Sequence, residues 1–258
     1  MAEEKLAQKK EELEKETKRN NQIKIMHEIT QIRKLSLWIF LIPFIAINLC
    51  LIISQNYEFL NKTIFIVDQI GRSGFSIPYL DGSLSISRAS RTFPQYLIFK
   101  PSMILTAILL YYYWKNNNAL INKYKSTNIN YNFKFFGILS AIFLTIHSIF
   151  LGIKFDIQIY KLLRRVVLLL FIIFEIIAQG ILVYHFYKIK NQLVQFINKK
   201  VLILKIILVS ILTTVAILSL PILLNKDNIH FKHALEWNYF VGVILFYLFS
   251  RFFWKRTT

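Results

Sequence analysis

The chain has 258 residues, of which 55% are hydrophobic and 16% aromatic, with a mean hydropathy of +0.46 and a formal net charge of +18. This composition is typical of a polytopic membrane protein, in which aromatic side chains anchor helix ends and basic loops lie at anionic headgroups. It leaves no basic, aromatic surface long enough for a nucleic-acid groove. The single cysteine, Cys50, excludes an intrachain disulfide and a multi-cysteine metal site.

Residues 2–34 form a charged N-terminal segment with nine Lys or Arg and seven Glu. Glu11 precedes Lys15 by four residues, a spacing that stabilises helices. We therefore expect an exposed charged helix or tail at 1–34, followed by a transmembrane domain at 35–258. A signal peptide is not expected, because the first apolar run begins only at Leu35, after this long charged segment.

Six apolar stretches of 18 to 24 residues fill the chain from Leu35 to Trp254. A hydrocarbon core about 30 Å thick needs roughly 20 helical residues to cross it, and within lipid the backbone must satisfy its own hydrogen bonds. The sequence thus predicts an all-α, polytopic membrane protein with six transmembrane helices and a long first outer loop. The predicted spans are 35–54, 96–114, 135–155, 166–186, 201–224 and 237–254.

Charge distribution predicts the orientation of these spans. If the N-terminus is cytoplasmic, the inner side carries 20 Lys and Arg against 11 on the outer side. The positive-inside rule then favours both termini in the cytoplasm. We expect the plasma or inner cell membrane rather than an endomembrane, with the connector 55–95 as the long outer loop, a length more often functional than incidental.

Within this loop, residues 78–82 (Pro-Tyr-Leu-Asp-Gly) predict a tight turn, because Pro78 fixes φ and Gly82 permits a positive φ. The turn would present Tyr79 and Asp81 at the outer surface. Asp81 has two interpretations. It pairs with Arg88 or Arg91, or it caps the backbone of its own turn, which is the commoner role for a turn carboxylate.

The start of the sixth span also has two interpretations. In the first interpretation, Glu236 and Trp237 bind a lipid headgroup. In the second, they anchor a helix end, where the helix dipole favours a carboxylate. We expect the outer loop to fold onto this helix start and form a mixed-charge rim able to hold a phosphate. The residues of this candidate outer-face site are Tyr79, Asp81, Arg88, Arg91, Glu236 and Trp237.

Four side chains with metal-ligand chemistry recur at three-residue steps, namely Asp227, His230, His233 and Glu236. Histidine and carboxylate are zinc ligands, but the His-Glu-x-x-His signature is absent. Solvated loop histidines are the favoured interpretation, so neither a metal nor a cofactor is predicted. The sequence also has no Gly-rich phosphate loop and no Gly-x-Ser-x-Gly elbow.

Inside the membrane, His147 and Glu175 are predicted to lie at similar depth on neighbouring antiparallel helices, by a count of 1.5 Å per residue. Gln179, one turn from Glu175, is a second partner. This polar group indicates a proton-linked or headgroup-binding cavity, or a structural hydrogen bond that orients the two helices. Lys100 and Lys205 fall near span ends, where long side chains can reach the headgroups.

Two short motifs carry a resemblance. The turn at 78–82 is followed by Pro94-Gln95 and Phe99 as the second span begins, and residues 234–237 (Ala-Leu-Glu-Trp) open the sixth. Their order and placement resemble the DRAM/Frag/Sfk family, also described as the CWH-type N-terminal domain. Members of that family have six spans, a Pro-Tyr-x-Ser-Asp/Glu-like run, a Pro-Glu before the second helix, and a small residue followed by Glu-Trp at the sixth.

The sequence departs from that pattern at three places. Gly82 and Ser83 follow Asp81, so the expected Ser-Asp order is missing. Gln95 replaces the acidic residue expected after Pro94, and residues 163–165 (Leu-Arg-Arg) replace the polar entry to the fourth helix. These departures bear on shared activity more than on the fold.

The resemblance implies lipid-related work in the membrane, because members are linked to lipid-anchor remodelling, phosphoinositide signalling and autophagy control. We expect a lipid-associated regulatory, scaffolding or lipid-handling role, with membrane lipids and a membrane-protein partner as candidate partners. The alternatives are a lipid-headgroup enzyme or transferase at the outer face, and a small proton-linked transporter that uses Glu175. The missing nucleophile motif favours a non-enzymatic role.

Overall fold

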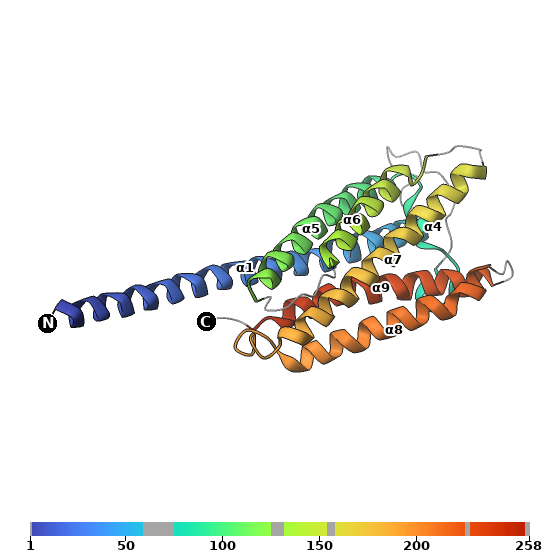
Figure 1. The fold of residues 1–258 in the computed structure, drawn as a ribbon. Helices are drawn as coiled ribbons and strands as arrows, with labels where there is room; N and C mark the ends of the chain where they lie inside the picture. The colour runs from blue at the N-terminus through green and yellow to red at the C-terminus, as the bar shows by residue number, and fades with distance from the viewer. Residues whose placement is uncertain (1, 59–74, 125–131, 154–157, 225–227, 256–258) are drawn as a thin grey trace.

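A computed structural model describes residues 2–58, 75–124, 132–153, 158–224 and 228–255 (Figure 1). The long helices are α1 (Ala2–Gln55), α5 (Gln95–Tyr124), α6 (Phe133–Phe150), α7 (Gln158–Ile189), α8 (Lys199–Leu224) and α9 (Ile229–Phe253). Two short helices, α3 (Pro78–Asp81) and α4 (Ile86–Ser90), lie in the first connector. Among the described residues the only strand-like pairing is a bridge between Ile197 and Trp254.

Five of these helices are long and apolar enough to cross a membrane: α1 from Gln8, α5, α6, α7 from Leu162 and α8 as far as Ser219. The chain is therefore a multi-pass, all-helical integral membrane protein. Helix α9, which carries the sixth predicted span, is not among these five, and polar residues such as Glu236, Asn238 and Arg251 interrupt its apolar sequence. The count of six spans thus stays a prediction.

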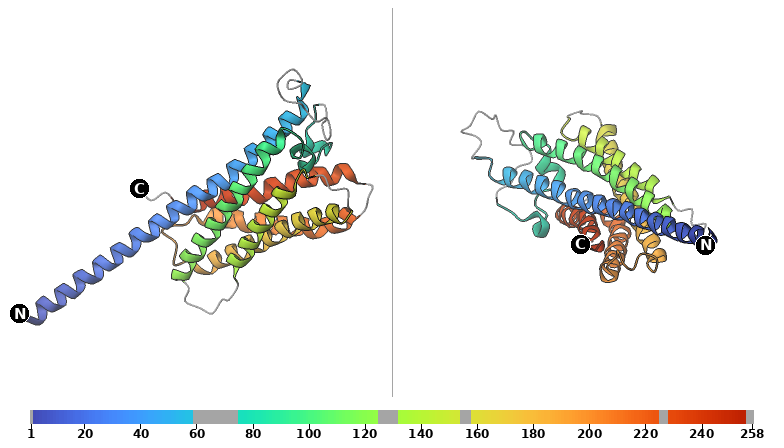
Figure 2. Two further views of the ribbon diagram at one scale, coloured as in Figure 1. Left: turned by 90° about the horizontal axis from the view of Figure 1, so that it is seen from above. Right: turned by 90° about the vertical axis from the view of Figure 1, so that its left-hand side faces the viewer.

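The long helices pack side by side in a closed order, α1 on α5, α5 on α6, α6 on α7, α7 on α8, α8 on α9, and α9 back on α1. Figures 1 and 2 show these helices as one elongated bundle. We call the end that carries α3 and α4 the loop end. The opposite end, where α1 leaves the bundle and α9 finishes, is the arm end.

Helix α1 is continuous for 54 residues, about 80 Å at 1.5 Å per residue. Its described side chains from Gln8 to Lys24 are exposed, and this segment, the arm, projects well beyond the bundle (Figures 1 and 2). The prediction of an exposed charged helix is confirmed there. From residue 25 onward α1 joins the bundle, with Ile29 and Ile32 buried, so the expected boundary at 34 lies inside a packed helix.

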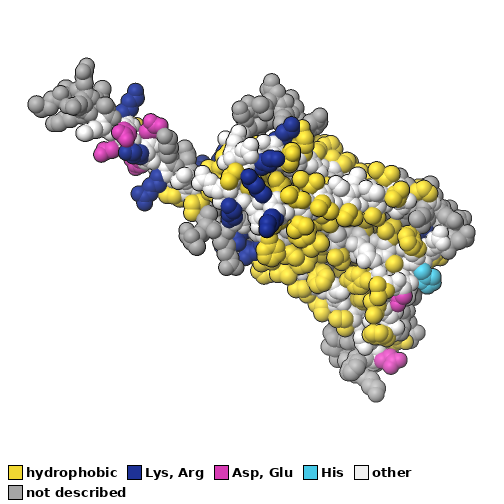
Figure 3. Space-filling model, turned by 90° about the horizontal axis from the view of Figure 1, so that it is seen from below, with side chains coloured by type: hydrophobic (Ala, Val, Ile, Leu, Met, Phe, Trp, Pro, Cys, Tyr) yellow, Lys and Arg dark blue, Asp and Glu magenta, His cyan; other side chains and the backbone are white. Residues whose placement is uncertain are grey.

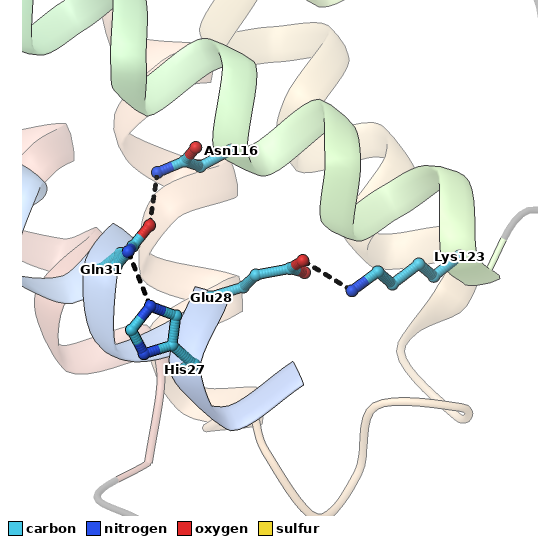
Figure 4. Close-up of polar contacts among 5 residues, drawn as sticks. All are labelled: His27, Glu28, Gln31, Asn116 and Lys123. Atoms are coloured by element: carbon cyan, nitrogen blue, oxygen red, sulfur yellow. Dashed lines mark hydrogen bonds and ion pairs between the residues drawn. The ribbon is translucent and has the colours of Figure 1, made fainter. Parts of the chain in front are cut away.

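Polar contacts fasten the base of the arm to α5 (Figure 4). Lys123 pairs with Glu28 at 2.6 Å. Gln31 of α1 also links the two helices, because its side-chain oxygen accepts a bond from Asn116 of α5 at 3.4 Å. Within α1, the side-chain amide of Gln31 lies 2.8 Å from a ring nitrogen of His27. The arm therefore leaves the bundle from a fixed base.

Several helices begin or end outside their predicted apolar runs. α5 continues ten residues past 114, and α7 and α9 each begin about two turns before residues 166 and 237. Polar residues extend these helices because the pattern of apolar side chains reports burial in lipid, not the end of the backbone hydrogen bonds. The second predicted span closes with an aromatic run at residues 111–114, and aromatic side chains commonly anchor such helix ends at the interface. Instead, Tyr113 and Trp114 are fully buried and only Tyr111 and Tyr112 are exposed.

Candidate functional site

The turn at residues 78–82 packs directly against the start of α9. Gly82 ends α3 in the left-handed conformation, with φ of 59°, as the sequence predicted. A Cβ atom added to Gly82 would overlap the backbone carbonyl of His230 in the first turn of α9. Glycine is therefore required here twice, for its backbone conformation and for its lack of volume.

Trp237 is the centre of this contact. Its ring lies 4.8 Å from that of Tyr79, and its indole N–H donates to the carbonyl of Leu84 at 2.7 Å. Asn238 donates to the carbonyl of Tyr79 at 2.7 Å, and the Tyr79 hydroxyl donates to Asn48 of α1 at 3.0 Å. The expectation that the first loop folds onto the last helix is confirmed, and α1 completes the contact.

The two carboxylates of the candidate outer-face site each serve the backbone. Asp81 accepts bonds from its own turn, from the N–H groups of Ser83 at 2.8 Å and Ile77 at 2.9 Å. The bond from Ser83 is the main cause of a lowered pKa for Asp81. Glu236 faces the backbone of Ile86 and Ser87 at the start of α4, which lowers its pKa, but burial has the larger effect and raises that pKa to about 7. The capping interpretation thus accounts for Asp81, whereas Glu236 lies about two turns inside α9 and faces α4 instead of anchoring the start of its own helix.

The arginines of the candidate site occupy different places. Arg88 is exposed, and its charge is one of the causes that lower the pKa of His233, after burial. Arg91 lies next to the connector after α6, because its carbonyl would touch a Cβ added to Gly152. Asp81 bonds to its own turn rather than to Arg88, so the expected mixed-charge rim is not assembled around that carboxylate.

The sequence placed four potential zinc ligands near the start of α9. Asp227 lies outside the described residues. His233 bonds through Nδ1 to the carbonyl of Gly82 at 2.9 Å, and Glu236 faces the backbone of α4. Among the described residues no group of three or more His, Cys, Asp or Glu is placed to hold a metal ion.

A polar cluster surrounds Glu175 in the middle of α7, where its side chain is fully buried. Its carboxylate accepts bonds from Ser140 of α6 at 2.6 Å, from Gln179 at 2.9 Å, and from the hydroxyl of Tyr247 on α9. The predicted Glu175–Gln179 contact is confirmed. Ser140 and Tyr247 were missed, although both are polar residues within otherwise apolar spans, which is the signal that would have found them.

The predicted pairing of His147 with Glu175 is wrong. His147 lies two turns beyond Ser140 on α6, in a pocket it shares with Leu163 and Arg164 near the start of α7. The depth estimate counted α7 from residue 166, whereas the helix begins at Gln158. That shift brings the part of α7 near residue 164, rather than Glu175, level with His147.

A second buried polar group, which the sequence did not predict, centres on Lys205 of α8. Lys205 is fully buried and does not reach toward the headgroups as expected. Its ammonium donates to Ser250 at 2.9 Å and lies over the rings of Phe246 at 4.1 Å and Phe253 at 5.1 Å. Ring faces attract cations, so these contacts compensate the buried charge. Lys100, by contrast, stays near the loop end and donates to the carbonyl of Ile149 at 3.2 Å.

The arm end carries a dense ring of positive charge, the basic belt. In the described part of the chain, segments 24–34, 115–124, 132–134, 188–200 and 251–255 hold twelve Lys or Arg and a single acidic residue, Glu28, which pairs with Lys123. Figure 3 shows basic side chains gathered where the arm joins the bundle, beside a broad apolar band. The described members of the belt beyond the arm are Arg33, Lys34, Lys115, Lys123, Lys134, Lys188, Lys190, Lys199, Lys200, Arg251 and Lys255.

Comparison of the chain with known protein families, with curated proteins and with solved structures gives no match.

Proposed function

We propose that the chain is a lipid-associated scaffolding or regulatory membrane protein of the DRAM/Frag type. In this proposal α1, α5, α6, α7, α8 and α9 all span the plasma or inner cell membrane, with the arm end in the cytoplasm. Contact between the 78–82 turn and Trp237 supports the family assignment, because it joins the two motifs on which the resemblance depends.

The basic belt is the observation that carries the lipid association. Cytoplasmic leaflets expose anionic headgroups, and each Lys or Arg near such a surface contributes about 1 kcal/mol of attraction. Lys34, Lys115, Lys199 and Lys200 are exposed, and the one acidic side chain of these segments already pairs with Lys123. The belt is therefore suited to gather anionic lipids around the bundle.

A scaffolding role is supported by the arm. Its exposed face carries both charges, and Glu11 pairs with Lys15 at 2.7 Å along the helix. An extended, charged helix of this kind offers a surface for a soluble or membrane-protein partner rather than for a small substrate. Its base is fixed by the contacts of Glu28 and Gln31 with α5, so a bound partner is held at a set position above the belt.

An outer-face enzyme receives less support. Catalytic carboxylates must be free to act on substrate, whereas both oxygens of the exposed Asp81 accept bonds from its own turn, and Glu236 faces the backbone of α4. Moving the Asp81 carboxylate away from its partners would leave the N–H groups of Ile77 and Ser83 without their acceptor, which costs free energy. Asp81 and Glu236 are better explained as residues that hold the first connector in place.

The buried core favours proton-linked transport as a second candidate. Tyr247 bonds to Glu175 and packs edge-on against Tyr113, with ring centroids 5.0 Å apart. Tyr113 bonds to Ser250 at 2.9 Å, and Ser250 accepts from Lys205. The buried carboxylate of Glu175 and the buried amine of Lys205 are thus linked by side-chain contacts in the core of the bundle. This candidate predicts proton flux in proteoliposomes that Glu175→Gln abolishes, and no flux in wild-type vesicles would eliminate it.

The lipid proposal is tested by removing two belt charges. In nanodiscs that contain phosphatidylglycerol and phosphatidylcholine, we expect Lys199→Gln/Lys200→Gln to lower the preference for phosphatidylglycerol about thirtyfold, at about 1 kcal/mol per charge. Arg88→Gln/Arg165→Gln removes two exposed charges from the loop end and serves as the matched control. Native mass spectrometry of the retained lipids is the measurement. Equal preference in the wild type and the belt variant would eliminate the proposal.

A further inference from the structure

The turn at residues 78–82 lies beside the bundle rather than above its end. The carbonyl of Tyr79 accepts a bond from Asn238, which is about 13 Å along the axis of α9 from its first residue. The Tyr79 hydroxyl donates to Asn48, about 10 Å along the axis from the end of α1. α1 is one of the helices able to cross a membrane, and its apolar stretch 35–54 includes Asn48. The turn thus reaches into the depth range of a membrane-spanning segment.

The side of the turn that faces away from the bundle is apolar. Leu80, next to Tyr79, is 82% exposed, and Ile77 just before the turn is 47% exposed. On α1, Leu49 and Ile52 are exposed as well. Ile52 follows Asn48 by four residues and therefore lies on the same face of α1, the face to which Tyr79 bonds. The exposed apolar surface of the turn is thus continuous with that of α1.

The backbone of the turn is paired in the way that an apolar environment requires. Within lipid no water replaces a missing bond, so each unpaired N–H or carbonyl group costs several kcal/mol. The carboxylate of Asp81 accepts bonds from the N–H groups of Ile77 and Ser83 at 2.9 and 2.8 Å. Pro78 has no N–H group to satisfy. Three further N–H groups donate to the carbonyls of Ile77 or Pro78, and these are the N–H groups of Leu80, Asp81 and Gly82.

We propose that this turn inserts into the membrane leaflet at the loop end, where Leu80 and Ile77 contact the acyl chains of its lipids. Lipid is the occupant because the exposed apolar surface of the turn continues the exposed surface of a membrane-spanning helix. The chain then returns toward the surface, since Gly82 lies against His230 in the first turn of α9. Figure 2 shows the connector that contains the turn, in teal, beside both α1 and α9.

The inserted turn is independent of the lipid association proposed for the basic belt, because the two lie at opposite ends of the bundle. It rests on the membrane span of α1 and holds for either orientation of the protein in the membrane. Arg88 on α4 is exposed at the same end of the bundle but does not belong to the apolar surface. This residue therefore serves as a control position in water, and Ile52 serves as a control position in lipid.

The test measures which reagents reach these side chains in full-length Cys50→Ser protein in phosphatidylcholine liposomes. A nitroxide label is attached to Leu80→Cys, Ile52→Cys or Arg88→Cys, one at a time. Oxygen concentrates among acyl chains, whereas a nickel chelate stays in water, and each accelerates the relaxation of a label that it reaches. We expect oxygen to act more strongly than nickel at Leu80 and Ile52, and nickel to act more strongly than oxygen at Arg88.

A second measurement needs no label. Leu80→Glu places a carboxylate among the acyl chains, so hydrogen exchange of peptides from 75–94 in liposomes should become about tenfold faster. Leu80→Met keeps the side chain apolar and should leave this exchange unchanged. Equal exchange in the Leu80→Glu and Leu80→Met proteins would contradict insertion.

The labelling results also separate the other environments of the turn. Nickel access at Leu80 equal to that at Arg88 would show that the turn faces water, and would overturn the proposal. Exclusion of both reagents from Leu80 would show that protein covers it, such as a second copy of this chain, and would overturn it too. Nickel access at Ile52 would overturn the span of α1 itself, on which the inference rests.

Discussion

The indole of Trp237 lies against the phenol ring of Tyr79, with ring centroids 4.8 Å apart and planes inclined by 58°. The two residues are 158 positions apart in the chain and come from the last helix and the first connector. Because Trp237 also donates to Leu84, the pair joins an apolar contact to a directional bond. The loop is thereby held in one position on the helix start.

Gly82→Ala should detach the turn from α9. The added Cβ overlaps the carbonyl of His230, and the alanine must also adopt a positive φ. We therefore expect a loss of about 1–3 kcal/mol in local stability. Hydrogen exchange of peptides from 75–94 measures it. Gly180→Ala is the control, because its Cβ meets only Val209 at an ordinary 3.6 Å. Unchanged exchange in the Gly82 variant would contradict the close contact.

Glu236→Gln should change how stability depends on pH. Burial raises the pKa of Glu236 from 4.5 to about 7, so the folded protein keeps a proton that the unfolded chain releases above pH 4.5. Wild-type stability should therefore fall relative to Glu236→Gln as pH rises from 4.5 to 7, and the difference between the two should be constant below that range. Thermal unfolding in detergent across this range decides it, and a difference that is independent of pH throughout would refute the assignment.

Glu175→Gln should be tolerated better than Glu175→Leu. Glutamine keeps an oxygen that accepts bonds, whereas leucine leaves the donors of Ser140, Gln179 and Tyr247 unpaired, at about 1–3 kcal/mol for each one. Denaturation in detergent compares the two variants.

His147→Leu provides a further check on the Glu175 cluster. Since His147 lies in a separate pocket, its effect should add to that of Glu175→Leu in a double-mutant cycle. Strong coupling between the two positions would show that they contact each other after all.

Orientation can be tested by cysteine labelling in a Cys50→Ser protein. A cysteine at Asn191, which is exposed at the arm end, should react only from the cytoplasm, and one at Phe75, which is 89% exposed, only from outside. Two other positions are less suitable for this labelling. Ser85, in the first connector, is buried, and Ser126, between α5 and α6, lies outside the described residues. Labelling of Phe75→Cys from the cytoplasm would reverse the proposed topology.

The apolar runs predicted where helices lie, because lipid imposes the same demand on every spanning residue. They did not predict where helices begin. α9 starts at Ile229 through polar residues that pack on the outer turn, and this early start is what aligns His233 and Trp237 with the loop. The turn itself was predictable, since Pro78 and Gly82 restrict the backbone locally.

Partners of buried polar groups were harder to predict, because they depend on the rotation of each helix. One residue of helix rotates a side chain by about 100°, so depth alone could not select Ser140 or Tyr247 for Glu175. Lys205 shows the same limit. Its place near the end of a span favoured contact with headgroups, but the neighbouring phenylalanines surround it.

Helix α1 also connects the two ends of the molecule mechanically. Near the loop end, Asn48 accepts the bond from Tyr79, and Gln55 donates to the carbonyl of Ser76 at 2.5 Å. These contacts lie on the same continuous helix as the arm, with Pro43 the one proline inside it. One continuous helix therefore carries both the arm and the residues that hold the 75–82 segment. A single helix about 80 Å long thus joins the charged arm to the contacts at the loop end.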